Sequence, residues 1–134
     1  MSQPFRLQFK VRDYECDMQG IVNNGVYFNY LEHARHEFLI ERGVNFAELT
    51  AAGIHLVVVK AELDYKASLT SGDEFYIEVV PERPSKVRFA FRQTVVRLSD
   101  NKVVLSALIT GTSLNTAGRP YLHPDVDLVF PLSN

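Results

Sequence analysis

Polar and apolar residues alternate strictly at the start of the chain. Over residues 5–12 every second side chain is apolar, and the side chains between them are Arg, Gln or Lys. This period of two is typical of a strand with one buried face. The segment 13–24 that follows is polar and contains glycine, so it is predicted to be a loop.

The period changes to that of a helix over residues 25–42. Asn24 is the predicted N-cap and Gly43 the predicted residue just beyond the C-cap, which gives a helix of about 18 residues. The segment Asn45–Glu48 has the spacing of a capping box, so a second, short helix is expected to end near Ala52. One broad apolar stripe of the long helix includes Tyr27, Leu31, Ala34 and Phe38.

Most of the chain after residue 53 has the character of strands. Four stretches combine alternation with aromatic or β-branched residues, and they cover 57–65, 75–79, 87–98 and 103–114. Turn or break signals separate them, at 71–73, 81–84 and 99–101. The tail, 118–134, holds three prolines and shows no clear period.

The order of these elements predicts an α+β fold in one domain spanning residues 1–134. A strand, a long helix and a short helix precede four further strands. A curved five-stranded antiparallel sheet can wrap around one long, broadly apolar central helix and bury it. An open sheet of this kind leaves an edge strand unpaired, so the chain is expected to form a homodimer.

Composition narrows the classes of function. Sixteen Asp and Glu against fourteen Lys and Arg give a net charge of −2, so there is no basic surplus for binding nucleic acid. The single cysteine, Cys16, excludes a disulfide framework and a Cys-rich zinc site. The longest uncharged stretch, 103–118, alternates apolar residues with Ser and Thr and is predicted to be a strand, not a membrane span. Without a secretion-signal pattern at the N-terminus, we expect a soluble, cytoplasmic protein.

The segment that could carry chemistry lies just before the long helix. Asp13, Glu15 and Asp17 place three carboxylates a few residues ahead of the helix start. A helix start has unpaired backbone N–H groups and a positive dipole end that can hold a developing oxyanion. A nearby carboxylate can act as a general base on water or as a nucleophile. Together these parts suit acyl transfer or thioester hydrolysis without a metal, although the same residues are also common caps and loop formers.

The motif Asp17-Met-Gln-Gly-Ile-Val-Asn-Asn24 resembles the signature of hot-dog thioesterases of the 4-hydroxybenzoyl-CoA thioesterase type. The amino-acid sequence of residues 11–15, 20–24 and 34–39 is similar to that of plant plastid acyl-lipid thioesterases and of their bacterial acyl-CoA and acyl carrier protein (ACP) thioesterase relatives. The resemblance covers almost the whole chain and implies the hot-dog form of the predicted fold. The helix positions that share in it are Tyr27, Tyr30, Glu32, Ala34 and Arg35.

The resemblance implies hydrolysis of an acyl thioester carried by coenzyme A or ACP, in homodimers or in dimers of dimers (homotetramers) with sites at subunit interfaces. It puts Asp17 in the place of the catalytic aspartate, and the backbone around Asn24, Gly25 and Val26 in that of the oxyanion donor. It implies no cofactor and no metal. Many relatives carry His or Tyr where this chain has Asn23 and Asn24, a variant that also occurs in ACP thioesterases and favours fatty-acyl over aromatic substrates.

Further residues are candidates for substrate contacts, each with a structural alternative. Glu32 and Arg35 line a pocket or a subunit interface, or else form an i,i+3 ion pair on the helix surface. His33 and His36 have no companion ligand motif and give no metal site, and Cys16 is expected to pack and not to react. The pocket candidates are Gly20, Ile21, Val22, Asn23, Tyr27, Glu32, Arg35, Val57 and Val59. A set of basic residues has two interpretations. It is a docking patch for the phosphates of coenzyme A or for an acidic carrier protein, or it is a solvated strand face. The set comprises Arg83, Lys86, Arg88 and Arg92.

Three functions compete with a fatty-acyl thioesterase. A hydratase or dehydratase typically pairs an acid with a histidine, and segment 13–24 contains no histidine. A non-catalytic acyl-thioester-binding or assembly module has no need for a carboxylate such as Asp17 beside the thioester. A thioesterase for an aromatic or polyketide acyl group stays open, as do the carrier, the chain length, the nucleophile or base role of Asp17, and the choice between dimer and tetramer.

Overall fold

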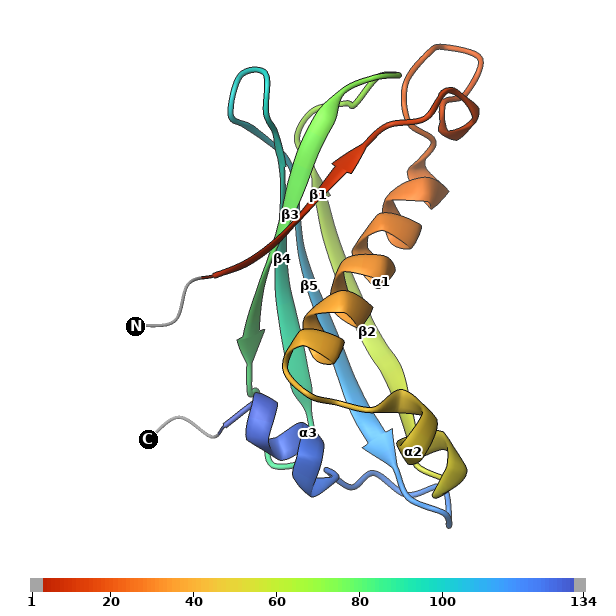
Figure 1. The fold of residues 1–134 in the computed structure, drawn as a ribbon, viewed down its shortest axis with the longest axis vertical. Helices are drawn as coiled ribbons and strands as arrows, with labels where there is room; N and C mark the ends of the chain where they lie inside the picture. Colours follow the sequence, from red (N-terminus) through yellow and green to blue (C-terminus); the bar gives the residue numbers. More distant parts are fainter. Residues whose placement is uncertain (1–3, 132–134) are drawn as a thin grey trace.

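A computed structural model describes residues 4–131, in which a twisted antiparallel sheet packs against one long helix, α1 (Figure 1). The strand order is β1-β3-β4-β5-β2, and every neighbouring pair is antiparallel. The predicted α+β architecture is confirmed. In chain order the elements are β1 (Phe5–Lys10), the 3₁₀ turn η1 (Asp13–Glu15), α1 (Asn24–Glu41), α2 (Phe46–Ala51), β2 (His55–Tyr65), β3 (Glu74–Glu82), β4 (Phe89–Arg97), β5 (Lys102–Leu114) and α3 (Pro124–Val129).

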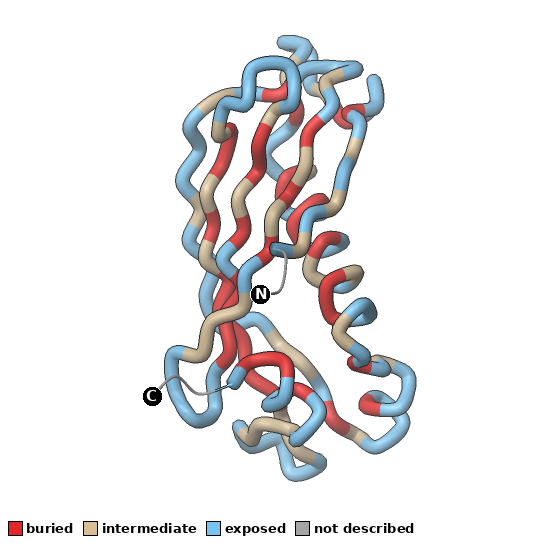
Figure 2. The backbone as a smooth tube through the Cα atoms, turned by 60° about the vertical axis from the view of Figure 1, so that its left-hand side comes forward, coloured by how far each residue is buried: buried red, intermediate tan, exposed pale blue. Residues whose placement is uncertain are grey.

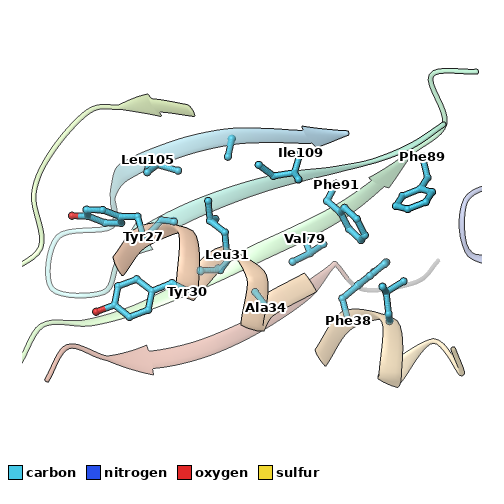
Figure 3. Close-up of a cluster of buried hydrophobic side chains, with 14 of the residues drawn as sticks. Tyr27, Tyr30, Leu31, Ala34, Phe38, Val79, Phe89, Phe91, Leu105 and Ile109 are labelled. Atoms are coloured by element: carbon cyan, nitrogen blue, oxygen red, sulfur yellow. The ribbon is translucent and has the colours of Figure 1, made fainter. Parts of the chain in front are cut away.

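The core lies between the sheet and the inward face of α1 (Figure 3). Leu31, Ala34 and Phe38 are fully buried there, because their spacing of three and four residues puts them on one side of the helix. More buried and more exposed positions alternate along β1 and most of β3, in the way that a half-covered sheet requires (Figure 2). The outer side of α1 is different: Phe28 is 48% exposed. A single chain therefore buries one side of the helix and leaves the other uncovered.

The ends of the helices follow from capping residues. The N-cap of α1 is Asn23, one residue earlier than predicted, and its Oδ1 accepts the Gly25 N–H at 3.0 Å. Gly43 follows the helix with φ +88°, as its predicted place beyond the C-cap requires. Asn45 caps α2 by accepting the Glu48 N–H at 3.1 Å. No helix of the described chain is both long and apolar enough to cross a membrane.

Two regions differ from the prediction. The expected break at 81–84 is wrong in part, because β3 continues to Glu82 and Pro81 lies opposite Phe91 of β4. This proline is tolerated because β1 pairs with β3 only as far as Val79, so β3 has a free edge beyond that point. The tail also contains a helix, α3, which was not predicted. Pro124 is its first residue, and Phe130 just after it packs against the rings of β4.

One edge of the sheet, β2, is exposed along its whole length. It pairs only with β5, and none of its eleven residues is buried. Val58 and Val59 are 54% and 46% exposed, next to a register shift that lies between Val58 and Lys60. An exposed apolar edge strand is a surface on which another strand can pair.

Candidate active site

The segment before α1 folds into a small hairpin, residues 15–23, which we name the Asp17 hairpin. Cys16 and Val22 form an antiparallel bridge, and the Asp17 N–H donates to the Ile21 carbonyl at 2.8 Å. The Gly20 N–H closes the turn by donating to the Asp17 carbonyl at 3.0 Å. Gly20 has φ +81°, a left-handed conformation that glycine adopts without strain. The predicted loop is therefore a tight turn with a fixed register.

The Asp17 side chain has one oxygen in use and one oxygen free. Its Oδ1 accepts the Gln19 N–H at 2.9 Å, which is the turn-forming role of an Asp in a loop. Its Oδ2 has no donor among residues 4–131, and the residue is exposed. The carboxylate is thus held by the turn while one oxygen remains available to attack a carbonyl or to accept a proton from water.

The start of α1 leaves one backbone donor unused. Of the three predicted oxyanion donors, the Gly25 N–H is taken by Asn23 Oδ1 and the Val26 N–H by the Asn23 carbonyl at 2.9 Å. The Asn24 N–H has no acceptor in the described part of the chain. It stands at the positive end of the helix dipole, where a negative oxygen is stabilised. The structure therefore narrows the predicted set to Asn24.

The Asp17 hairpin connects these two groups directly. The Asn23 N–H donates to the Glu15 carbonyl at 3.1 Å, so the hairpin ladder runs from the Asp17–Ile21 bond to this bond. Asp17 lies two residues along the ladder from Glu15, a separation of about 7 Å. The carboxylate of Asp17 is on one arm of this short, hydrogen-bonded unit, and Asn24 directly follows the other arm.

A second set of contacts ties the hairpin to the β2–β3 connection. The Val22 N–H donates to the Leu69 carbonyl at 2.9 Å, and the Leu69 N–H donates to the Tyr27 hydroxyl at 3.1 Å. Burial is the main reason that the pKa of Tyr27 is raised. Tyr27 is accordingly a buried neutral phenol that joins α1 to this connection, and Val22 is a core residue.

Glu15 is one of the three carboxylates noted ahead of the helix, although the prediction gives it no role of its own; its carboxylate is largely buried, with 9% of the residue exposed. Its Oε1 accepts the Arg12 N–H and the Tyr30 hydroxyl, both at 2.8 Å. Burial first, and this bond second, raise the pKa of Tyr30 above its ordinary value. No sequence pattern separates Glu15 from the exposed Asp13. Cys16, between Glu15 and Asp17 in the chain, has a thiol whose pKa is raised by burial and by the neighbouring carboxylates, so it stays protonated at neutral pH.

The predicted pocket residues lie at both ends of α1. An apolar cavity of about 470 Å³ is enclosed by α1, α2, the start of β2 and parts of β4 and β5, and Glu32, Arg35 and Val57 lie on its wall. Arg35 is eleven residues after Asn24, or about 16 Å along the helix. Val59 is not part of this wall and is exposed on the edge of the sheet. Asp17 and Asn24 do not line this cavity in the single copy.

Arg35 is half-buried in that cavity wall and does not form the alternative ion pair with Glu32. No Glu32 oxygen lies within 4 Å of it. Its Nη1 instead donates to Gln93 Oε1 at 3.1 Å, and its guanidinium lies 5.9 Å from the centre of the Phe91 ring. Burial lowers the pKa of Arg35. The side chain is a charged group within a wall that is mainly apolar.

The four basic candidates do not form one surface. The side chain of Arg83 is only 4% exposed, because it donates to the carbonyls of Ser85, Lys86 and Phe130 and pairs with Asp127. It joins the β3–β4 connection to α3 and is not available for docking, which corrects the prediction. Arg92 pairs with Glu82 across the strands. Lys86 and Arg88 are exposed. Residues 4–131 contain no cluster of three or more His, Cys, Asp or Glu suited to a metal ion.

Residues 11–129 match the family model described as the thioesterase-like superfamily. The chain belongs to this superfamily. This thioesterase-like chain is 35% identical over 124 residues to the chloroplastic acyl-ACP thioesterase ATL3 of Arabidopsis thaliana, an alignment that covers 92% of the chain and 65% of that protein. It therefore spans slightly less than two thirds of the length of that relative. It is also 32% identical to the long-chain acyl-CoA thioesterase FadM of Escherichia coli, with 77% of each protein covered.

Solved structures support the same fold for the thioesterase-like chain. A hypothetical protein of Aquifex aeolicus superposes with a TM-score of 0.84 and 30% identity, covering 93% of this chain and 97% of that one. The 1,4-dihydroxy-2-naphthoyl-CoA thioesterase of Synechocystis superposes with a TM-score of 0.86 and 92% coverage of both chains. At 16% identity, that likeness bears on the fold alone. The predicted hot-dog fold is confirmed.

Proposed function

We propose that the chain hydrolyses an acyl thioester to the free acid and the thiol, with Asp17 as the catalytic carboxylate and the Asn24 N–H as the oxyanion donor. The observation that supports the proposal is that the Asp17 hairpin carries a carboxylate with one free oxygen and leads directly into the helix start, whose Asn24 N–H has no acceptor among residues 4–131. The names of the relatives in Arabidopsis thaliana and Escherichia coli, thioesterases for acyl-ACP and for long-chain acyl-CoA, support the reaction class.

Two routes use the same groups. As a nucleophile, Asp17 attacks the thioester carbonyl, the C–S bond breaks to release the thiolate, and water then hydrolyses the mixed anhydride. As a general base, Asp17 takes a proton from a water molecule that attacks the carbonyl directly, and the departing sulfur takes up the proton. Both routes place negative charge on the carbonyl oxygen, where the Asn24 N–H contributes about 3–4 kcal/mol of transition-state stabilisation.

We infer that the site is completed in a homodimer formed along β2. The exposed apolar edge of β2 supports pairing of two copies about a two-fold axis. The Asp17 hairpin lies at the end of the molecule that the Tyr65 end of β2 reaches, and the apolar cavity lies at its His55 end, beside α2 (Figure 1). Antiparallel pairing of the two β2 strands brings the partner's Asp17 toward this cavity. The acyl chain then occupies the cavity of one copy while the other copy supplies the carboxylate.

The size and lining of this cavity favour a fatty-acyl substrate. Its wall is mainly Leu, Ile, Val and Phe side chains and encloses about 470 Å³, a volume typical of small-ligand sites. The two possible carriers, coenzyme A and ACP, have the same phosphopantetheine arm. The exposed Lys86 and Arg88 are the remaining docking candidates. Charge reversal of both Lys86 and Arg88 would identify the carrier if it raised the KM for the acyl-CoA or for the acyl-ACP, but not for the other.

The test is thiol release from a panel of acyl-CoA and acyl-ACP substrates, comparing wild type with Asp17→Asn. The asparagine keeps an oxygen for the Gln19 N–H, so the turn persists while the charge is lost. We expect a decrease of about 10²–10⁴-fold in kcat, the contribution of a positioned carboxylate. Asp125→Asn, an exposed aspartate on α3, is the matched control. Equal rates for wild type and Asp17→Asn contradict the site, and a wild type inactive on every substrate favours the non-catalytic binding module.

A further inference from the structure

Glu15 joins the two arms of the Asp17 hairpin through its backbone, and joins the hairpin to the second turn of α1 through its carboxylate. Its backbone carbonyl accepts the N–H of Asn23, the residue that caps the helix. Its side chain accepts the hydroxyl of Tyr30, six residues further along the helix than Asn24. Glu15 is also two residues before Asp17 in the chain. A single residue therefore contacts the elements that carry both proposed catalytic groups.

We propose that Glu15 and Tyr30 are positioning residues, whose hydrogen bond holds the Asp17 hairpin at a fixed distance and angle from the start of α1. The inference rests on the proposed function, since it concerns the geometry of that site. The reaction needs the Asp17 oxygen and the Asn24 N–H on the same carbonyl group, and a displacement of about 1 Å can cost a hundredfold in rate.

Tyr30 is suited to this role because its ring cannot move easily. The ring centre lies 4.9 Å from that of Phe75 and 5.5 Å from that of Phe9, so strands β1 and β3 enclose it. Only 4% of the residue is exposed. Its hydroxyl is directed away from the middle of the core, toward the end of α1 that carries the hairpin (Figure 3). The hairpin is thereby anchored to a buried aromatic residue of the core.

The surroundings of Glu15 suit a residue that positions the hairpin and takes no part in the chemical step. Its Oε1 already accepts two donors at 2.8 Å, from Arg12 and Tyr30, and the residue is almost enclosed. The Arg12 guanidinium, 3.8 Å from the same oxygen, is the nearest positive charge. Glutamine has an oxygen that accepts the same two hydrogen bonds without the charge. Glu15→Gln therefore separates a positioning role from a chemical one.

The experiment compares kcat, KM and amide hydrogen exchange in wild type, Tyr30→Phe, Glu15→Ala and Glu15→Gln. We expect Tyr30→Phe and Glu15→Ala to lower kcat about tenfold to a hundredfold, with KM close to wild type. Glu15→Gln is expected to restore most of kcat. The exchange rates of the Asp17 and Asn23 amides should rise about tenfold in Tyr30→Phe, because both amides lie in the hairpin ladder.

Val126→Ala is the control for lost stability alone, since Val126 is a fully buried residue of α3 at the opposite end of the molecule. It should lower the melting temperature and leave kcat unchanged. A Tyr30→Phe protein that loses stability but keeps kcat overturns the inference, and a Glu15→Gln protein as inactive as Glu15→Ala assigns Glu15 a chemical role instead. If wild type hydrolyses no thioester, the proposed function fails, and hydrogen exchange still decides the anchoring: unchanged exchange at Asp17 and Asn23 overturns it.

Discussion

Replacing Asn24 with proline tests the oxyanion donor because it removes one backbone N–H and little else. Asn24 is the first residue of α1, a position where proline is favoured since its fixed φ suits the helix. The Asn24 N–H has no acceptor among residues 4–131, so no hydrogen bond is lost. The preceding residue, Asn23, has φ −65° and ψ 141°, an extended conformation that a following proline permits.

Asn24→Pro is expected to lower kcat without lowering the stability of the protein. Proline restricts the unfolded chain, so the free energy of unfolding should stay the same or rise by about 0.4–1 kcal/mol. Loss of one oxyanion donor costs about 2.7–4 kcal/mol, so kcat should fall about 10²–10³-fold. A less active protein that is at least as stable as wild type cannot owe its loss of activity to unfolding.

The assay is steady-state hydrolysis of the acyl thioester that wild type prefers, with thermal unfolding of the same preparations. Asn24→Ala keeps the N–H and removes only the side chain, so it is expected to keep most of the wild-type kcat. A proline ring that merely obstructs the substrate raises KM and leaves kcat near wild type. Wild-type kcat in a folded Asn24→Pro protein would refute the assignment of this N–H.

Three further predictions concern stability and assembly. Gly111→Ala should lower the free energy of unfolding by about 1–3 kcal/mol in chemical denaturation, because its Cβ would come within 2.8 Å of both the Phe89 ring and the Val57 carbonyl oxygen; unchanged stability would show that the ring and the neighbouring strand both adjust at no cost. The bond from Arg97 lowers the pKa of Asp100 from 3.8 to about 2, so its stabilisation is full above pH 4 and is lost as the pH falls toward 2; carboxyl NMR titration checks this, and a midpoint near 3.8 contradicts it. Val59→Lys should convert a dimer to monomers in sedimentation, because it puts a charge on the exposed edge of β2; a persistent dimer would exclude this edge.

The sequence predicts the elements well where a periodic pattern and a buried face coincide. The long helix was expected over 25–42 and runs over Asn24–Glu41, because its apolar spacing matches the face that it buries. Its N-cap was misplaced by one residue. Asn23 and Asn24 are equally suited to cap a helix, and only the extended backbone of Asn23 decides between them.

The tail was not predictable by the same means. The helix α3 has six residues, too few for a period to show, and an isolated helix of that length is unstable in water. It forms because Val126 and Phe130 are buried against the sheet. The burial of Arg83 depends on it, since Asp127 and the Phe130 carbonyl are two of its partners. The sequence alone therefore predicts Arg83 to be an exposed basic residue in a turn, because its burial depends on contacts with the folded tail.

The candidate site, like the fold, is predictable from the sequence only in part. The motif around Asp17 indicates a carboxylate next to a helix start, but it does not say which N–H groups the caps consume. It also gives no reason to distinguish Glu15 from Asp13, because burial of a carboxylate depends on a donor such as Tyr30 from elsewhere in the chain. These details follow from long-range contacts, which local periodicity does not encode.

A free N–H at the first residue of a capped helix is ordinary, because a cap side chain reaches the second or third N–H and not the first. The start of α1 in this respect resembles that of many helices. What sets it apart is the Asp17 hairpin, which returns along itself from Glu15 to Asn23, so that Asp17 lies on one arm and the other arm leads directly into Asn24. Lengthening the turn between Asp17 and Gly20 would leave the helix, its cap and its free N–H unchanged. If the hairpin is the functional unit, that change alone should abolish hydrolysis.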